Sequence, residues 1–183
     1  KYRKVAAGEP GQFRYPTGEE GLAGLGYEPG WISHLPQRVR ECFCGVGNPF
    51  AMGLPEPGMK VLDVGSGCGV DTLVSAGFAG PGGMAVGVEM SPEMLGKARG
   101  NAHESEAGNA YFVQATADVL PFADGTFDMV TSSGVYNLVV DKRAALAEAF
   151  RVLKPGGRLQ VADQILTGPP PMSASDMVAS WFT

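Results

Sequence analysis

From Met59 onward, hydrophobic and polar positions follow a regular order along the chain. Short apolar runs bounded by turn residues predict buried strands, and longer segments with apolar residues at helical spacing lie between them. The strands are expected at residues 60–64, 84–89, 110–114, 127–132 and 158–165. Strands that alternate with helices predict an α/β fold with a parallel sheet, in which ligands bind beyond the carboxyl ends of the strands.

Helices are expected over residues 70–78, from 92 onward and from 142 onward. Ser91 and Asp141 are the predicted N-caps of the last two, because their side-chain oxygens can accept hydrogen bonds from free backbone N–H groups. In the last helix, one stripe at helical spacing is predicted to face the sheet. It consists of Leu146, Ala149, Phe150 and Leu153. The run Lys154–Gly157 is predicted to end this helix, and residues 172–183 resemble the start of another.

Residues 1–57 lack a strong period and are rich in glycine, proline and aromatic side chains. Short helices are expected from an N-cap at Thr17 to residue 25, and over residues 36–42. The prolines and glycine of Pro55–Gly58 separate this stretch from the regular pattern. We therefore expect residues 1–57 to form an arm or cap over the active site, and residues 58–183 to form the core.

Composition narrows the class of protein. The 183 residues are 44% hydrophobic and 18% charged, which is typical of a globular domain. The net charge of −5, without any block of Lys and Arg, argues against a nucleic-acid partner. The chain has neither an apolar run of membrane-spanning length nor a signal-peptide pattern. Three cysteines, an odd and sparse set, favour reduced thiols and a cytoplasmic location.

The stretch Val61–Gly69 is the strongest candidate for ligand binding. An apolar strand runs into a turn with glycine at every second position, and a helix follows. Glycine has no Cβ, so such a turn lets the backbone approach a ligand closely, and the helix N-terminus favours negative charge. By itself this pattern fits a nucleotide, a dinucleotide or S-adenosylmethionine (SAM).

Three further features accompany the turn. Asp63 is a lone acid in an apolar strand, which is costly unless the carboxylate is paired or faces a ligand site. Glu89 ends the second strand, where an acid can accept hydrogen bonds from both ribose hydroxyls of an adenosine. The loop 116–122 follows the third strand and can bracket an adenine. Each also has a structural interpretation, as a sheet-end aspartate, a solvated glutamate or an ordinary loop.

Taken in order, four segments of this chain resemble the successive motifs of class I SAM-dependent methyltransferases. They are Val61–Gly69, Gly87–Glu89, Leu120–Phe122 with Phe127–Val130, and Val152–Leu159. The resemblance implies a Rossmann-like, doubly wound parallel sheet of order 3-2-1-4-5. Such sheets are normally completed by an antiparallel 6/7 hairpin, which is expected to be missing from this chain.

A closer resemblance is to the arsenite methyltransferase branch. It is carried by Gly45–Pro49, Gly65–Asp71, Ser132–Leu138 and Asp141–Lys142. The resemblance implies that SAM is the cofactor and S-adenosylhomocysteine its product. It implies that the amino-acid end of SAM contacts Asp63, Gly65, Ser66 and Gly67. It also implies that the ribose contacts Glu89 and that the adenine contacts Met90, Thr116 and Ala117. Ser132 would contact the methionine amine through its backbone.

The chain also departs from this branch. The branch has cysteine at the positions of Val46 and Gly134. Its third cysteine follows a Trp-x-x pattern, and this sequence ends with Trp181–Thr183, one residue before that position. Thiolates are the soft donors that suit As(III), so most of the arsenic-binding set is absent. Cys44 is a possible substitute for one of them. An acid commonly pairs with the adenine amine at the position of Thr116, and Asp118 is the alternative here.

The remaining candidates are weaker. Tyr136 and Asn137 follow the fourth strand and are either acceptor contacts or loop structure. Cys42 and Cys44 could bind a soft metal or be small, partly buried thiols, and no metal site is assigned. Cys68 is expected to fill a small position in the glycine turn. No residue is assigned as catalytic, because SAM already carries an activated methyl group and alignment can supply much of the rate.

We therefore expect a methyltransferase acting on a small-molecule or metalloid acceptor. One alternative is a SAM-binding or structural remnant without turnover, and another is an NAD-linked Rossmann enzyme. An exposed edge on the fifth strand would allow a homodimer.

Overall fold

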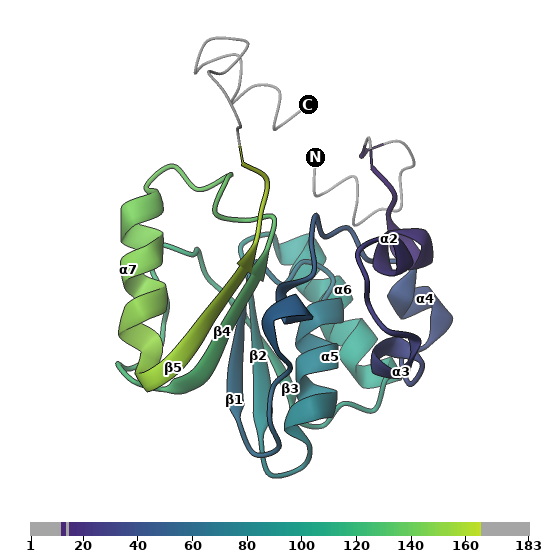
Figure 1. Ribbon diagram of the computed structural model, residues 1–183, viewed down its shortest axis with the longest axis horizontal. Coiled ribbons are helices and arrows are strands. Elements are labelled where there is room, and N and C mark those ends of the chain that lie inside the picture. Colours follow the sequence, from purple (N-terminus) through teal and green to yellow (C-terminus); the bar gives the residue numbers. More distant parts are fainter. Residues whose placement is uncertain (1–11, 14, 166–183) are drawn as a thin grey trace, which may run out of the picture.

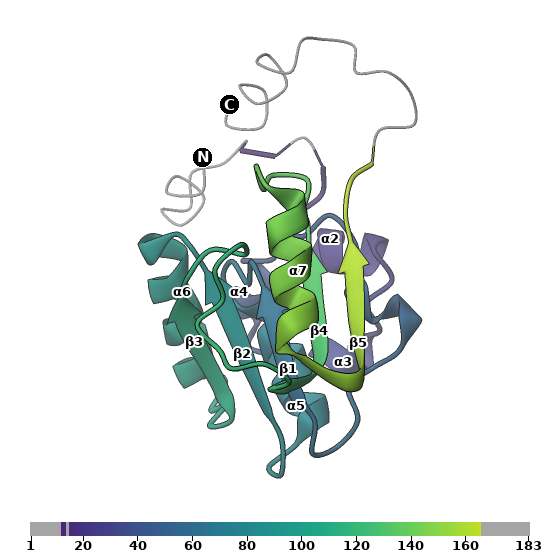
Figure 2. The ribbon, with the colours of Figure 1, turned by 90° about the vertical axis from the view of Figure 1, so that its left-hand side faces the viewer.

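A five-stranded parallel sheet runs through the centre of the computed structural model, which describes residues 12–13 and 15–165. The strands are β1 (Lys60–Val64), β2 (Met84–Glu89), β3 (Ala110–Gln114), β4 (Phe127–Ser133) and β5 (Leu153–Ala162). They lie in the order β3-β2-β1-β4-β5, as Figure 2 shows. The direction of winding reverses between β1 and β4, where doubly wound sheets bind their ligands. The predicted fold class and strand order are confirmed.

Helices cover both faces of the sheet (Figure 1). One face carries α5 (Val70–Ala79) and α6 (Pro92–Glu104), and the other carries α7 (Lys142–Val152). The two predicted N-caps are confirmed. The Ser91 hydroxyl accepts a hydrogen bond from the Met94 N–H at 3.3 Å, and the Asp141 carboxylate accepts one from the Ala144 N–H at 2.9 Å.

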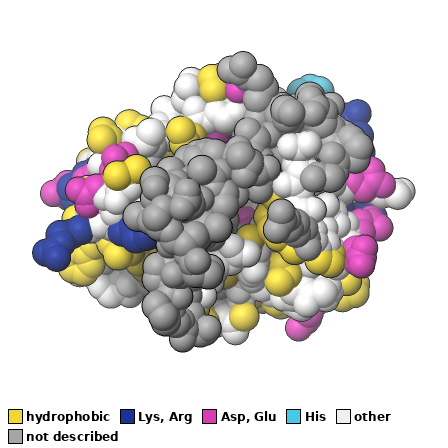
Figure 3. Space-filling model, turned by 90° about the horizontal axis from the view of Figure 1, so that it is seen from above, with side chains coloured by type: hydrophobic (Ala, Val, Ile, Leu, Met, Phe, Trp, Pro, Cys, Tyr) yellow, Lys and Arg dark blue, Asp and Glu magenta, His cyan; other side chains and the backbone are white. Residues whose placement is uncertain are grey.

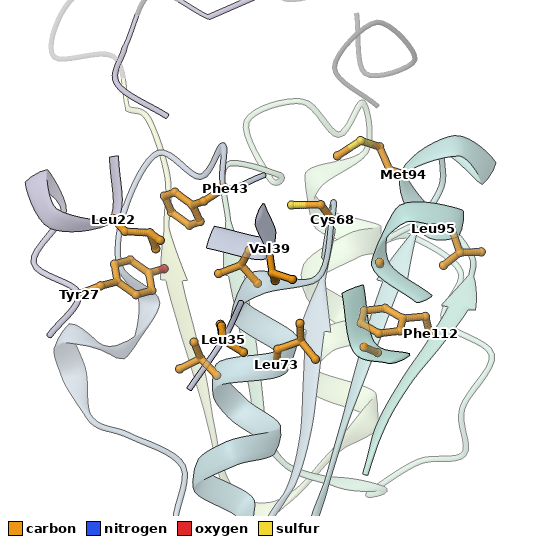
Figure 4. Packing of buried hydrophobic residues seen from close by; sticks show 14 of the residues in the cluster. Leu22, Tyr27, Leu35, Val39, Phe43, Cys68, Leu73, Met94, Leu95 and Phe112 are labelled. Carbon is orange, nitrogen blue, oxygen red and sulfur yellow. The ribbon is translucent and has the colours of Figure 1, made fainter. Parts of the chain in front are cut away.

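The N-terminal segment consists of short helices, of which the α-helices lie beside α5 and α6 (Figure 1) and the 3₁₀ helix packs on β4 and β5. These are α2 (Gly18–Gly24), α3 (Pro29–Ile32), α4 (Gln37–Arg40) and the 3₁₀ helix η1 (Pro49–Met52). Thr17 occupies the N-cap position of α2, but its side chain makes no capping hydrogen bond. Figure 4 shows side chains of this segment in one cluster with those of the sheet region, among them Tyr27, Phe43, Leu73 and Phe112. The two parts of the chain therefore share a hydrophobic core.

The predicted apolar stripe on the helix after β4 is wrong in part. Ala149 is buried, but Phe150 is 79% exposed and Leu146 is 44% exposed. The face of α7 that packs on the sheet is instead made of Ala145, Ala149 and Val152, all of them fully buried. The small alanines let the helix axis approach the sheet closely. A prediction based on the largest apolar side chains therefore assigned the wrong buried face.

The predicted start of the fifth strand is also wrong. Instead of a loop over residues 154–157, α7 passes directly into β5 at Leu153. Phe127 of β4 pairs with Leu153 and Met129 pairs with Arg158, so β5 carries an irregularity between these two positions. Gly156, with a φ of +81°, lies within it, and the Lys154 ammonium is 2.6 Å from the Asp128 carboxylate. Two steps along β4 correspond to five along β5, so β5 accommodates three extra residues at this irregularity.

Two expectations concern the C-terminal region. The helix start at residues 172–183 and the absence of a 6/7 hairpin both lie outside the described residues. For residues 12–13 and 15–165, none of the helices has the length and apolar character needed to cross a membrane.

Candidate functional site

The glycine turn between β1 and α5 lies at the carboxyl edge of the sheet, beside the switch in strand order. Gly65, Gly67 and Gly69 have φ values of +75°, +55° and +89°, a region that other residues adopt only with strain. The N–H groups of Gly65 and Ser66 both donate to the carbonyl oxygen of Val88, at 2.8 and 2.9 Å. The turn is therefore tied to the end of β2.

Two of these glycines are also required by space. A Cβ on Gly65 would lie 2.1 Å from a methyl carbon of Val135, and one on Gly69 would lie 2.8 Å from the ring of Phe112. A Cβ on Gly67 would meet nothing closer than 3.5 Å. At Gly65 and Gly69, both the close packing and the positive φ require glycine. At Gly67, only the positive φ requires it.

Glu89, at the end of β2, connects the glycine turn with the N-terminus of α6. One carboxylate oxygen accepts a hydrogen bond from the Gly67 N–H at 3.0 Å, and the other accepts one from the Ser91 N–H at 2.8 Å. Each carboxylate oxygen has a second lone pair for a further donor. The structure therefore brings together the predicted acid and the predicted turn.

Asp63 is buried beneath the turn, with an exposed fraction of 2%. One carboxylate oxygen accepts a hydrogen bond from the Thr72 hydroxyl at 2.7 Å, and the other lies 3.5 Å from the Thr131 hydroxyl. Burial raises the pKa of Asp63 to about 6, against the opposing effect of these hydroxyls. The carboxylate is paired with hydroxyls within the protein, and its role toward a ligand stays a prediction.

Asp71 is a second buried acid that the sequence reasoning did not single out. Its carboxylate accepts a hydrogen bond from the Tyr27 hydroxyl at 2.7 Å. Burial, followed by the negative charge of Asp63, raises the pKa of Asp71 to about 8. The available signal was an acid in the first turn of the helix after the glycine loop, and its partner lies 44 positions away in the N-terminal segment.

The end of β4 forms the other side of the switch point. The Ser132 hydroxyl is buried and donates to the carbonyl oxygen of Val64 at 3.0 Å. The Ser133 hydroxyl donates to the carbonyl oxygen of Gly47 at 3.1 Å and accepts from the Val46 N–H at 3.3 Å. The segment 45–47 is thus docked on the end of β4.

The predicted adenine contacts lie next to β2 and β3. Met90 is 68% exposed, and its carbonyl oxygen accepts a hydrogen bond from the Gln114 side chain at 3.4 Å. Thr116 is exposed and Ala117 is buried, in the loop after β3. The carboxyl ends of β2 and β3 are neighbours, since Glu89 pairs with Gln114. The described geometry brings these residues to one edge of the sheet; their roles toward a ligand stay predictions.

The two positions where the arsenite branch has cysteine lie against each other. A Cβ on Gly134 would come within 3.0 Å of a methyl carbon of Val46. Cys44 lies nearby in the chain, and burial raises the pKa of its thiol to about 12. Among the residues that the structure describes, no group of three or more His, Cys, Asp or Glu side chains could hold a metal ion.

Three predicted site residues carry buried polar atoms without a hydrogen-bond partner. They are the Ser66 hydroxyl, the Tyr136 hydroxyl and the Asn137 carbonyl oxygen. Buried polar atoms are normally paired, so unpaired ones favour a missing ligand or water. Burial also raises the pKa of Tyr136 to about 12, which keeps its hydroxyl protonated. Unpaired atoms, positive-φ glycines and the Glu89 carboxylate fit an adenosyl cofactor with a polar amino-acid end.

The charge distribution near this edge is uneven. Seen from above, the charged side chains of the described residues are visible mainly at the left and right sides of the view, and hydrophobic side chains lie between and beside them (Figure 3).

Comparison with known proteins identifies the class. A family model described as a methyltransferase domain matches residues 55–180. The arsenite methyltransferase of Halobacterium salinarum is 36% identical over 165 residues, which cover 90% of this chain and 42% of that protein. A ubiquinone/menaquinone biosynthesis C-methyltransferase of Vibrio vulnificus is 42% identical over 108 residues, 58% of this chain and 42% of that protein.

A solved structure agrees with these relatives. An arsenic(III) S-adenosylmethionine methyltransferase from Chlamydomonas reinhardtii matches with a TM-score of 0.66 and 33% identity, over 81% of this chain and 50% of that one. The chain therefore belongs to the class I SAM-dependent methyltransferases and resembles the arsenite branch. SAM rather than NAD is thus the cofactor of this fold. The chain spans 42% of the length of the two curated relatives named above.

Proposed function

We propose that this chain transfers the methyl group of SAM to a small-molecule acceptor beyond the carboxyl ends of β1 and β4. The observation that carries the proposal is the Glu89 carboxylate, which accepts the Gly67 N–H and so joins the glycine turn to the end of β2. When bound, SAM supplies a methyl group on a positively charged sulfur, ready for displacement. The protein then has to align the acceptor with that methyl group, for which no acid or base is required.

The proposed cofactor contacts follow the two sides of the switch point. Gly65, Ser66 and Gly67 hold the amino-acid end through backbone groups and the unpaired Ser66 hydroxyl. Asp63, beneath the turn, also helps to hold the amino-acid end, and the backbone of Ser132 contacts the methionine amine of SAM. Glu89 accepts the ribose hydroxyls, and Met90, Thr116 and Ala117 enclose the adenine.

The acceptor is proposed to be an organic molecule rather than arsenite. Relatives named as arsenite methyltransferases argue for a metalloid, but Val46 packs against Gly134 at the two positions where that branch has thiols. Val135 follows Gly134 in the chain and packs against Gly65. Val46, Gly134 and Val135 therefore offer an apolar surface at the end of β4. Tyr136 and Asn137, with their unpaired polar atoms, are the proposed polar contacts to this acceptor. Cys44 is the alternative contact if the acceptor is a metalloid.

Cofactor binding is tested with Gly67→Arg. A non-glycine residue at a φ of +55° is strained and its long side chain fills the turn, so SAM affinity should fall more than about 100-fold. Isothermal titration calorimetry with SAM measures the change. Gly82→Arg is the matched control, because Gly82 is exposed and a Cβ there meets nothing within 4 Å. Absence of SAM binding to the unaltered chain would refute the proposal.

Turnover separates the enzyme from a SAM-binding remnant. Protein that binds SAM is incubated with isotopically labelled SAM and either arsenite with a thiol reductant or a set of phenolic and quinol acceptors. Formation of S-adenosylhomocysteine and a labelled organic product supports the proposed function. Labelled methylarsenicals instead would establish a metalloid acceptor, and SAM binding with no product from any acceptor would favour the remnant.

A further inference from the structure

Two thiols that lie 26 positions apart in the chain meet under the glycine turn. Cys42 follows α4, and Cys68 stands between Gly67 and Gly69. The Cys68 thiol donates a hydrogen bond to the carbonyl oxygen of Cys42 at 2.8 Å, and the Cys42 thiol lies 3.1 Å from the carbonyl oxygen of Arg38. Standard backbone geometry then puts the Cys68 sulfur within about 5 Å of the Cys42 Cα. Figure 4 shows Cys68 in the shared core, in the same cluster as Val39 of the N-terminal segment.

The two thiols differ in exposure and in acidity. Cys42 is partly exposed, and a hydrogen bond from the Cys68 thiol together with the charge of Lys97 lowers the pKa of Cys42 to about 6. Cys68 is 4% exposed, and its interaction with Cys42 together with burial raises its pKa. Thiolates are the nucleophilic form of cysteine. A reagent from solvent can thus reach Cys42, whereas Cys68 can react only with a neighbouring group inside the protein.

We propose that Cys42 and Cys68 form a dithiol that a hydroperoxide converts into a disulfide. The Cys42 thiolate attacks one peroxide oxygen and the O–O bond breaks, which gives a sulfenic acid and, after protonation of the leaving group, water or an alcohol. The Cys68 sulfur then attacks the Cys42 sulfur. Its proton leaves with the displaced hydroxyl as water, and the S–S bond forms. Two thiols are oxidised and one hydroperoxide is reduced.

The disulfide would tie the N-terminal segment to the turn that the proposed function assigns to SAM. Residue 42 lies in the segment that carries Tyr27, Phe43 and Phe50, and residue 68 lies in the turn itself. A covalent bond between them restrains both. The proposed oxidation depends only on the thiol pair, so it stands whether or not the chain methylates any acceptor.

Cys44 is the competing partner. It is two residues from Cys42, and, besides burial, the negative charge of an ionised Cys42 is one of the causes that raise the pKa of the Cys44 thiol. Burial raises the pKa of its thiol to about 12, so Cys44 remains protonated while Cys42 is ionised. The thiol that reacts first is therefore Cys42.

The test is peptide mapping of the full chain after treatment with hydrogen peroxide. Trypsin leaves Cys42 and Cys44 together in peptide 41–60 and Cys68 in peptide 61–97. The Cys44→Ala variant makes Cys42 the single thiol of the first peptide. In this variant and in the unaltered chain we expect peptides 41–60 and 61–97 to be linked, with a mass about 2 Da below their sum. Dithiothreitol should separate them again.

Two variants complete the test. Cys42→Ser should lose the link, and its Cys68 should stay reduced because peroxide cannot reach it. Cys68→Ala should lose the link as well, and its Cys42 should oxidise more slowly than in the unaltered chain, because the hydrogen bond that lowers the pKa of Cys42 is gone; circular dichroism shows whether this variant is folded. A link that persists in Cys42→Ser would assign the pair to Cys44 and Cys68 and overturn the proposal. Sulfinic acid at Cys42 in the unaltered chain, without any linked peptide, would overturn it equally.

Discussion

At the scale of single residues, two buried carboxyl groups set the electrostatics of this site. Asp63 and Asp71 lie under the glycine turn with pKa values raised to about 6 and about 8. A raised pKa means that the folded state binds protons more tightly than the unfolded chain. Stability therefore falls as the pH rises from about 4, where unfolded aspartates ionise, through these two values.

The first prediction follows from Asp71. The amide oxygen of Asp71→Asn can still accept the Tyr27 hydroxyl, but the buried charge is gone. We expect the free energy of unfolding at pH 8 to rise by about 1–3 kcal/mol, with a smaller loss between pH 5 and pH 8. Denaturant titrations across this range measure both quantities. The exposed Asp118→Asn serves as the control, and equal pH slopes for the two variants would contradict the prediction.

Residues also differ in how visible their roles are in the sequence. Asp63 stands out because an acid interrupts an apolar strand, and Glu89 because it ends the next strand. Asp71 gives no such signal, since an acid in a first helical turn is common. Its burial depends on Tyr27, which is brought to it by the packing of the N-terminal segment.

At the scale of elements, α7 shows how a period can be recognised while the buried face is misassigned. The helix and its N-cap were predicted, but two large side chains of the proposed stripe are exposed. The helix sits close to the sheet through Ala145, Ala149 and Val152. A hydrophobic pattern weights residues by apolar size, whereas close packing of a helix on a sheet can select small ones.

The second prediction compares neighbours on α7. Ala149→Leu introduces a large side chain where the helix meets the sheet and should cost about 1–3 kcal/mol of unfolding free energy. Phe150→Ser changes a side chain that is 79% exposed and should alter stability by less than about 0.5 kcal/mol. Chemical denaturation of both variants measures the difference. A larger loss for Phe150→Ser than for Ala149→Leu would show that the opposite face is buried.

At the scale of the whole molecule, the N-terminal segment and the sheet region share one hydrophobic cluster. Phe50 of η1 is 2% exposed and makes edge contacts with Tyr27 and Trp31, and Trp31 in turn contacts Phe78 of α5. Aromatic pairs of this kind add to the stabilisation from their buried area. The N-terminal segment therefore contributes to stability, and its residues 45–47 also pack on the end of β4.

The third prediction tests this coupling. Phe50→Ala leaves a cavity in the shared core and should cost about 3–5 kcal/mol. Because the core is shared, thermal unfolding should remain one transition at a lower midpoint temperature. Met52→Ala is the control, since Met52 lies in the same 3₁₀ helix and is 65% exposed. Two separate calorimetric transitions would instead show that the segment melts independently.

A fourth prediction concerns assembly. β3 and β5 are the outer strands of the described sheet, and an unpaired strand edge can pair with another chain. We propose a homodimer formed through the β5 edge. Light scattering coupled to size-exclusion chromatography should then give a mass that increases with protein concentration toward twice the 19.1 kDa of the chain. A monomer mass at every concentration would rule out this assembly.

Local patterns were sufficient for much of this protein. The strands other than the start of β5, their parallel direction, the caps at Ser91 and Asp141, and the glycine turn with its acid at the end of β2 all depend on short stretches of chain. Hydrophobic period, capping chemistry and glycine conformation act within a few residues, and the ordered motifs then indicate the family. The strand order and the choice of SAM over other nucleotides came from the resemblance of these ordered motifs to a known family, not from the local features alone.

Tertiary packing decided the rest. The hydrogen bond between Tyr27 and Asp71, the contact of Val46 with Gly134, and the meeting of Cys42 with Cys68 each join positions far apart in the chain. No local pattern encodes such a contact, because it depends on how complete elements pack. The irregularity in β5 and the exposed side of α7 have the same origin. Short-range physics thus specifies the elements and the cofactor turn, and packing determines which polar, acidic and thiol groups surround that turn.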